Sequence, residues 1–187
     1  GKTGLAAKAA NIIVGASGDL QSGAALSLEA TQALTLDGTL LALDALSLSG
    51  AASLDVNGST QSVGKTPLAS DSALTTRGTV TASGDISARA ANASLGGTLS
   101  SGGTVGVTAT DASVTGRLAA KTAIDVTATG AATLASGSSL ESDGSTSVKG
   151  ANGAANGTLL SRTTTLIGAT AALDQTGRIE ARDGITL

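Results

Sequence analysis

Residues 18–37 read GDLQSGAALSLEATQALTLD, and residues 38–57 read GTLLALDALSLSGAASLDVN. The two stretches share an opening glycine, an aliphatic residue at the third position, a small residue at the fifth, and a leucine pair at the ninth and eleventh. Self-similarity at a fixed spacing of this size is the sequence signature of a repeat protein.

The frame continues through most of the 187 residues. A glycine opens each unit at positions 18, 38, 58, 78, 97, 116, 137, 157 and 177, with separations of 19 to 21 residues. We expect residues 1–187 to form a single β-helical repeat segment whose coils start near these nine positions.

Two units fit this frame loosely. In 58–77, Lys65-Thr66-Pro67 stands where the aliphatic pair should begin. In 137–156, Leu140 and Val148 come one place late. The sequence therefore predicts a distorted coil or an outward loop in each of these units.

The spacing of the aliphatic residues indicates strands. Leu26-Ser27-Leu28 and Ile124-Asp125-Val126 alternate with period two, which puts both aliphatic side chains on one face of a strand. One unit with two or three such strands cannot bury its apolar face alone, but units stacked in parallel bury it. Because crossovers between parallel strands are overwhelmingly right-handed, we predict an all-β fold, a right-handed parallel β-helix (solenoid) of about nine coils.

Glycine-containing dipeptides mark the expected corners. Turn-forming pairs occur at Asp37-Gly38, Asn57-Gly58, Asn152-Gly153, Asn156-Gly157 and Asp183-Gly184. An antiparallel meander of hairpins is the competing interpretation of these pairs. It would reverse the strand direction about every 8 to 12 residues, whereas one repeat of twenty with dissimilar halves favours one full coil per repeat.

The composition excludes much chemistry. The chain has no His, Cys, Met, Phe, Tyr or Trp, and its large apolar side chains are 24 Leu, 9 Val and 7 Ile. An imidazole base, a thiol nucleophile, a disulfide and a soft metal site are therefore excluded. We expect neither a cofactor nor a metal, and we interpret the missing aromatic residues as the mark of a narrow interior.

The charges are few and scattered. Eleven Lys and Arg against fourteen Asp and Glu give a net charge of −3. Nucleic-acid binding would need a concentrated positive stripe, so it is not expected. A small basic patch around Arg117 and Lys121 is the candidate site for a sulfated glycan. No stretch approaches the about 18 consecutive apolar residues of a transmembrane segment, and because the chain starts at Gly1 without Met we expect it to be a piece of a longer protein.

Carboxylates are the remaining catalytic candidates. Glycoside cleavage needs two carboxyl groups about 5 to 9.5 Å apart in a cleft. In the twenty-residue frame, Asp44, Asp143 and Asp183 share one corner, and Asp55 and Asp174 share another. The coils that carry them mostly lie far apart along the rod, so we do not expect an enzyme.

The residues also resemble a known family. The pattern Gly-x-Leu-x-Ser/Ala followed by Leu-x-Leu-x-Ala, clearest in Gly18–Gly23 and Leu26–Ala30, is similar to the twenty-residue repeats of filamentous haemagglutinin-type adhesins. The resemblance covers residues 5–187. These adhesins are exoproteins of Gram-negative two-partner secretion systems, and the resemblance implies a secreted β-helical fibre that passes through an outer-membrane transporter and is displayed at the bacterial cell surface.

On this resemblance the function is structural. We expect a shaft segment of a surface-displayed adhesin that supports host-cell adhesion and virulence, with neighbouring repeats of the same chain as its direct partners and host-cell receptors or glycans as possible ones. The alternative, from a different class, is a carbohydrate-binding or carbohydrate-cleaving β-helix.

Overall fold

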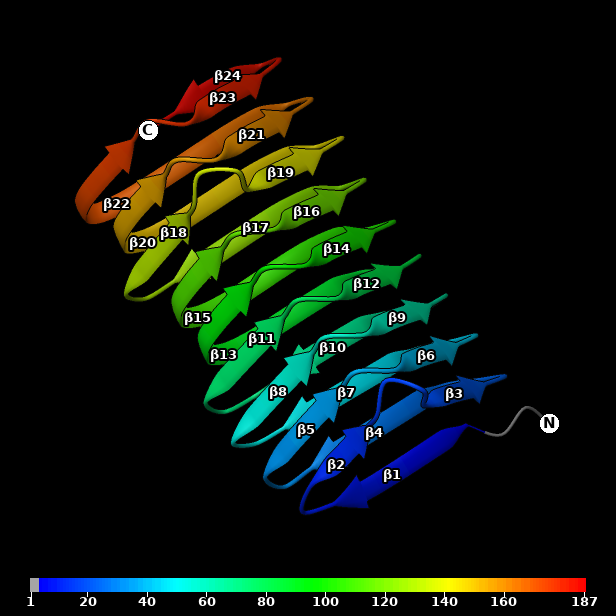
Figure 1. The fold of residues 1–187 in the computed structure, drawn as a ribbon. Helices are drawn as coiled ribbons and strands as arrows, with labels where there is room; N and C mark the ends of the chain where they lie inside the picture. Colours follow the sequence, from blue (N-terminus) through cyan, green and yellow to red (C-terminus); the bar gives the residue numbers. More distant parts are fainter. Residues whose placement is uncertain (1–3) are drawn as a thin grey trace.

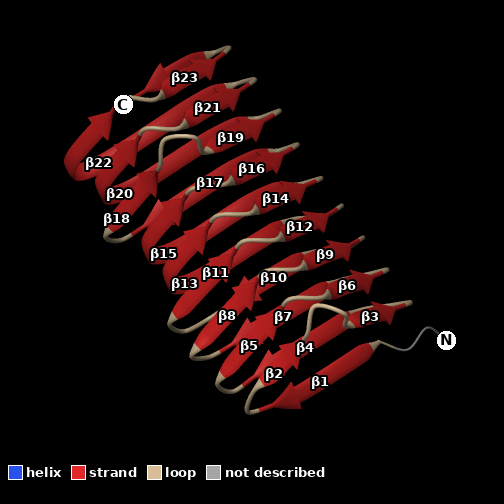
Figure 2. Cartoon of the chain, viewed as in Figure 1, coloured by secondary structure: helices blue, strands red, loops and turns tan. Residues whose placement is uncertain are grey.

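The chain folds into a rod of stacked coils made of β-strands. The computed structural model describes residues 4–187, so the first three residues of the expected segment 1–187 lie outside the described residues. Figure 1 shows the coils following one another from β1 to β24, with the two chain ends at opposite ends of the rod. In the part of the chain that is described, every regular element is a strand (Figure 2). No helix long and apolar enough to cross a membrane occurs among residues 4–187.

Each coil has up to three strand segments. The first segment is β1 (Leu5–Ala9), β4 (Leu26–Ala30), β7 (Leu46–Gly50), β10 (Thr66–Ala69), β17 (Ala123–Ala128) and β24 (Gly184–Thr186). The second is β2 (Ile12–Val14), β5 (Ala33–Leu36), β8 (Ser53–Val56), β11 (Ala73–Thr76) and β18 (Ala131–Leu134). In four coils a single bent strand covers both: β13 (Ile86–Leu95), β15 (Thr104–Val114), β20 (Ser145–Ala155) and β22 (Thr164–Gln175).

The third segment forms the opposite face of the rod. Its strands are β3 (Asp19–Ser22), β6 (Thr39–Ala42), β9 (Ser59–Ser62), β12 (Thr79–Ala82), β14 (Thr98–Ser101), β16 (Arg117–Ala120), β19 (Ser139–Ser142), β21 (Thr158–Ser161) and β23 (Arg178–Ala181). These strands make a nine-stranded sheet, and the first and second segments together make a 15-stranded sheet. Every strand pair is parallel, for example β4 with β7 and β12 with β14. The predicted parallel β-solenoid of about nine coils is confirmed, and the right-handed sense stays a prediction from the crossover rule.

Aliphatic side chains fill the interior as ladders along the rod. Leu34, Leu54 and Leu74 are paired in register on successive coils, and none of the three is accessible to solvent. On the opposite sheet, Leu99 and Leu118 continue a similar ladder. Since each side chain contacts its counterpart one coil away, burial is completed by stacking and not within a coil.

Corner glycines allow the coils to approach one another. The N–H of Thr79 donates to the carbonyl oxygen of Gly58, and the N–H of Thr98 donates to that of Gly78, both at 3.0 Å. A Cβ atom added at Gly78 or Gly97 would lie closer than 3.0 Å to the carbonyl oxygen of the corner glycine one coil below, a separation that real Cβ atoms essentially never show. The glycine frame therefore reflects close backbone approach, with φ negative at these corners.

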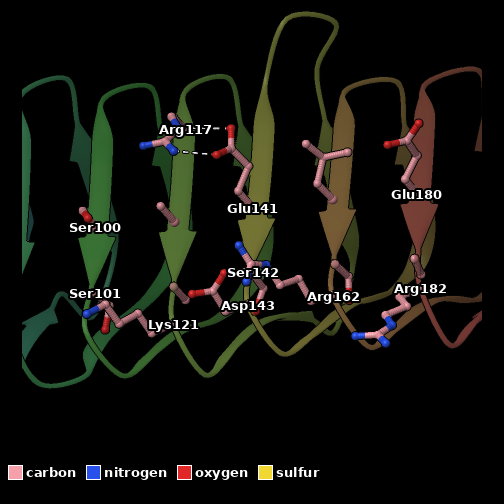
Figure 3. Close-up of a pocket in the computed structure, with 15 residues that line it drawn as sticks. Ser100, Ser101, Arg117, Lys121, Glu141, Ser142, Asp143, Arg162, Glu180 and Arg182 are labelled. Atoms are coloured by element: carbon pink, nitrogen blue, oxygen red, sulfur yellow. Dashed lines mark hydrogen bonds and ion pairs between the residues drawn. The ribbon is translucent and has the colours of Figure 1, made fainter.

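The corner expected at Gly137 is one residue off. Arg117 pairs with Ser139, 22 residues later, and Ser139 pairs with Thr158, so Ser138 is the residue that occupies the corner. Two extra residues form the loop 135–138, in which the N–H of Ser138 donates to the carbonyl of Ala135 at 3.1 Å. Gly137 lies in this loop with a φ of +88°, a conformation that glycine tolerates. An outward loop was predicted in this unit, and Figure 3 shows it rising above the neighbouring corners.

The other loosely fitting unit keeps its register and is irregular on one side only. In 58–77, Thr66 and Leu68 pair with Ile86 and Ala88, so Thr66 takes the first aliphatic place. Pro67 has no N–H, and the pairing of β10 with β7 is limited to Leu68 and Ala69. The predicted distortion is therefore confined to the pairing of β10 with β7, and this unit forms no outward loop.

Two further details differ from the sequence analysis. Asn152-Gly153 lies inside strand β20 and is no corner. A second outward turn, in which the N–H of Gly18 donates to the carbonyl of Gly15 at 2.7 Å, follows β2 and was not predicted.

Buried threonines weaken the interior locally. Thr60 stands in the ladder between Leu40 and Val80, 1% exposed, and its hydroxyl has no hydrogen-bond partner among the described residues. Thr76, in the same coil, is also buried, and its hydroxyl also has no hydrogen-bond partner among the described residues. A buried hydroxyl without a partner retains its desolvation cost. The coil at 58–77 is therefore regular in register but less stable in its packing.

The glycine column can be tested with two alanine variants. Gly78→Ala places a methyl group against the Gly58 carbonyl and should lower the free energy of unfolding by about 2–3 kcal/mol. Gly23→Ala is the control, because a Cβ there has no atom within 4 Å, and it should be neutral or stabilise by about 0.5 kcal/mol. Urea unfolding followed by circular dichroism measures both. Equal urea midpoints for the two variants would refute the claim that the corner glycines are required for the close approach of the coils.

The buried hydroxyl of Thr60 predicts a variant that is more stable than the parent chain, unlike Gly78→Ala. Thr60→Val removes an unpartnered hydroxyl at nearly constant volume and should raise the free energy of unfolding by about 1 kcal/mol. Thr79→Val, on the outside of the next coil, should change it by less than about 0.5 kcal/mol. A destabilised Thr60→Val variant would show that the hydroxyl has a partner in solution.

Candidate functional site

A groove runs across the outer face of the nine-stranded sheet, over β14, β16, β19, β21 and β23. Its volume is about 680 Å³. Its lining includes small residues such as Ala119 and Ala120 together with longer charged side chains such as Arg117 and Glu141. The hollow thus results from the change of side-chain size between neighbouring coils.

One side of the groove is an ion pair across coils. The Nε and Nη2 atoms of Arg117 donate to the two carboxylate oxygens of Glu141 at 3.2 and 2.5 Å, and the hydroxyl of Ser139 donates to the same carboxylate at 2.8 Å. These donors, Arg117 first, hold the pKa of Glu141 below its ordinary value of 4.5. The carboxylate in turn raises the pKa of Arg117. The two shifts favour the charged form of the pair.

The other side is a row of corner residues. Lys121, Asp143, Arg162 and Arg182 follow the third segment of successive coils, and Figure 3 shows them along the lower edge of the groove. Arg162 Nε lies 3.1 Å from an oxygen of Asp143. Within residues 4–187, Lys121 and Arg182 form no ion pair, so this side carries two uncompensated positive charges.

This arrangement suits anion binding better than acid catalysis. The free ammonium of Lys121 and the guanidinium of Arg182 can attract a carboxylate or sulfate group. A general acid for glycoside cleavage needs a raised pKa, whereas the pKa of Glu141 is lowered. Glu180, two coils from Glu141, is itself paired with Arg178.

The structure places both residues of the predicted basic patch at this groove but does not join them in one patch. Arg117 and Lys121 both line the groove, on opposite sides, and the guanidinium of Arg117 is engaged by Glu141. Glu141, Arg162 and Arg182 were missed. The glycine frame contained a signal for the basic corner row, because Lys121, Arg162 and Arg182 each stand five residues after a frame glycine, at 116, 157 and 177.

The same insertion corrects one predicted cluster of acids. Asp143 aligns with the corner row of Lys121 and Arg162, since its N–H donates to the carbonyl of Ala120. It therefore lies at the same corner as Asp44 and Asp183 but one position earlier, in the row of Arg182. The other predicted group, Asp55 and Asp174, does share one row, on coils far apart along the rod.

A second hollow, of about 290 Å³, lies over β11, β13, β15 and β18. Its lining is small and neutral except for Asp111, whose carboxylate accepts the N–H of Ala131 at 2.7 Å. Among the described residues, no group of three or more Asp and Glu is arranged to hold a metal ion. The groove is therefore the candidate site.

Comparison with protein-family models, with curated proteins and with solved structures found no match for the chain. The fold places the chain in the class of β-solenoid proteins.

The ion pair of the groove makes a prediction about pH. Because the pKa of Glu141 is lowered in the folded protein, its contribution to stability is present above its ordinary pKa of 4.5 and is lost as the pH falls through the lower folded value. Glu141→Gln should therefore reduce the free energy of unfolding at about pH 7 by no more than about 1 kcal/mol, since both partners are partly exposed. The difference should vanish in strong acid.

Urea unfolding at several pH values measures this effect. The double variant with Arg117→Gln and Glu141→Gln should be close to each single variant, because each change removes the same pair. A difference that persists unchanged in acid would contradict the assignment to the Glu141 carboxylate.

Proposed function

We propose that the chain is a structural shaft segment of a secreted, surface-displayed bacterial filamentous adhesin. The observation that carries the proposal is the repeated coil-to-coil contact: the ladders and corner hydrogen bonds that join one pair of coils recur at the next. A rod assembled in this way can extend its length without a new kind of contact. Its work is to hold a binding region away from the cell, and it is not an enzyme.

The composition supports export. With no cysteine, folding requires no disulfide, and each coil can add to the edge of the one before it. This order of folding suits a chain that crosses an outer-membrane transporter unfolded and is then displayed at the cell surface. The transporter, neighbouring repeats and host-cell receptors are the partners that belong to this proposal.

The ends of the rod test it. Terminal strands β1 and β24 each pair on one side only, and Ile185 of β24 is 47% exposed. Such open edges join to other edges. The chain should therefore form oligomers whose proportion rises with protein concentration in analytical ultracentrifugation.

Two lysine variants distinguish association through the ends of the rod from nonspecific hydrophobic association. Ile185→Lys should reduce the association, whereas Leu43→Lys should not, because Leu43 is equally exposed (50%) but lies on the flank of the rod after β6. A monomer at high concentration, or an equal effect of both variants, would contradict the shaft proposal.

The groove favours a second candidate function, the binding of acidic carbohydrate. Lys121 and Arg182 would contact sulfate or carboxylate groups, and salt would weaken the complex. On a sulfated-polysaccharide column, Lys121→Ala should elute at lower salt than the parent chain. Lys149→Ala, which removes a lysine outside the groove, is the control. Identical elution of the parent chain and both variants would exclude the groove as a glycan site.

A further inference from the structure

Two equivalent corners of the rod contain the same Asn-Gly dipeptide. Asn57-Gly58 joins β8 to β9, and Asn156-Gly157 joins β20 to β21. In this dipeptide the backbone nitrogen of glycine can attack the side-chain amide of asparagine, because no Cβ of the second residue obstructs the approach. The hydrogen bonds at each corner decide whether the attack occurs in the folded protein.

The corner at Asn57 is fully bonded. The N–H of Gly58 donates to the carbonyl of Leu36 at 2.9 Å. The Nδ2 atom of Asn57 donates to Asp37 at 2.9 Å, and its Oδ1 accepts from Arg77 at 3.1 Å. Both the attacking nitrogen and the amide group are therefore held in place.

The corner at Asn156 lacks these restraints. The N–H of Asn156 donates to the carbonyl of Leu134 at 2.9 Å, but the N–H of Gly157 donates to no acceptor among residues 4–187. The side-chain amide nitrogen of Asn156 also has no partner in this part of the chain. The one bond to the side chain comes from the hydroxyl of Thr176, which donates to Oδ1 at 2.7 Å and withdraws electrons from the amide carbon.

The missing N–H bond sets Gly157 apart from the other corner glycines. At six other corners the glycine N–H donates to the carbonyl of the coil below: Gly38 to Val14, Gly58 to Leu36, Gly78 to Val56, Gly97 to Thr76, Gly116 to Leu95 and Gly177 to Ala155. The coil below Gly38 has an outward turn of the same length as the loop 135–138, and the N–H of Gly38 still donates to Val14 at 3.2 Å, whereas the corresponding bond from Gly157 to Leu134 is absent.

We propose that Asn156 is a site of spontaneous deamidation in the folded rod and that Asn57 is protected. The nitrogen of Gly157 loses its proton to solvent base and forms a bond with Cγ of Asn156, the bond from Cγ to Nδ2 breaks, and ammonia leaves. Water then opens the cyclic imide at either carbonyl carbon, and the product is aspartate or isoaspartate.

The modification would act on the stack itself. Isoaspartate lengthens the main chain by one methylene at the corner, and Gly177 of the next coil packs against the backbone of residues 155–157. The extra atom disturbs this approach, so a rod modified at Asn156 should lose the pairing of β21 with β23 first.

The test compares three asparagines within one molecule. The intact chain is incubated at mildly alkaline pH, and peptide mapping by mass spectrometry measures conversion at residues 57, 152 and 156 over time. Asn156 should convert at least about tenfold faster than Asn57, the factor that corresponds to the net free energy of one hydrogen bond. In concentrated urea the two rates should become similar.

Equal deamidation rates at Asn57 and Asn156 in the folded chain would overturn the proposal. A rate difference that persists in urea would also overturn it, because the local sequence and not the fold would then cause the difference. Thr176→Val should slow conversion at Asn156 and leave Asn57 unaffected. Circular dichroism establishes that the Thr176→Val variant folds, and if it does not, the comparison within the parent chain decides.

Discussion

The carbonyl oxygen of each corner glycine lies where a side chain of the next coil would begin. This contact is closer than a Cβ atom allows, and the same oxygen accepts the N–H that starts the next third strand, as Gly58 does from Thr79. The spacing of the coils, the register of both sheets and the alignment of the aliphatic ladders all depend on this approach. Glycine is therefore a geometric requirement at the regular corners, and the exception is Ser138, which takes this place where the loop 135–138 enlarges the coil.

The same constraint explains the composition. A coil compressed to this extent has a narrow interior, which Leu34, Leu54 and Leu74 fill in register, and small residues form the corners around it. Stability then comes from neighbour contacts repeated along the rod. A chain organised in this way gains length easily, and this property is the physical basis of the shaft proposal.

Much of the fold could be predicted from the glycine frame and the period-two aliphatic pairs, because both report directly on strand stacking. The exceptions have local causes. Thr66 occupies an aliphatic place without a visible signal, and the loop 135–138 moves the corner from Gly137 to Ser138. The groove was only partly predicted, since Arg117 and Lys121 were identified while Arg162 and Arg182, which share the frame position of Lys121, were not connected with them.

Distances between coils test the central claim most directly. The chain has no cysteine, so spin labels can be placed at introduced cysteines on one outward row of the nine-stranded sheet, in the pairs Thr39 with Arg117 and Thr39 with Thr158. These pairs are four and six coils apart in register. Pulsed electron spin resonance should give narrow distributions separated by about 10 Å, near 19 and 29 Å, from a coil spacing of about 4.8 Å. Distances that do not increase with the number of coils would contradict the stacked solenoid.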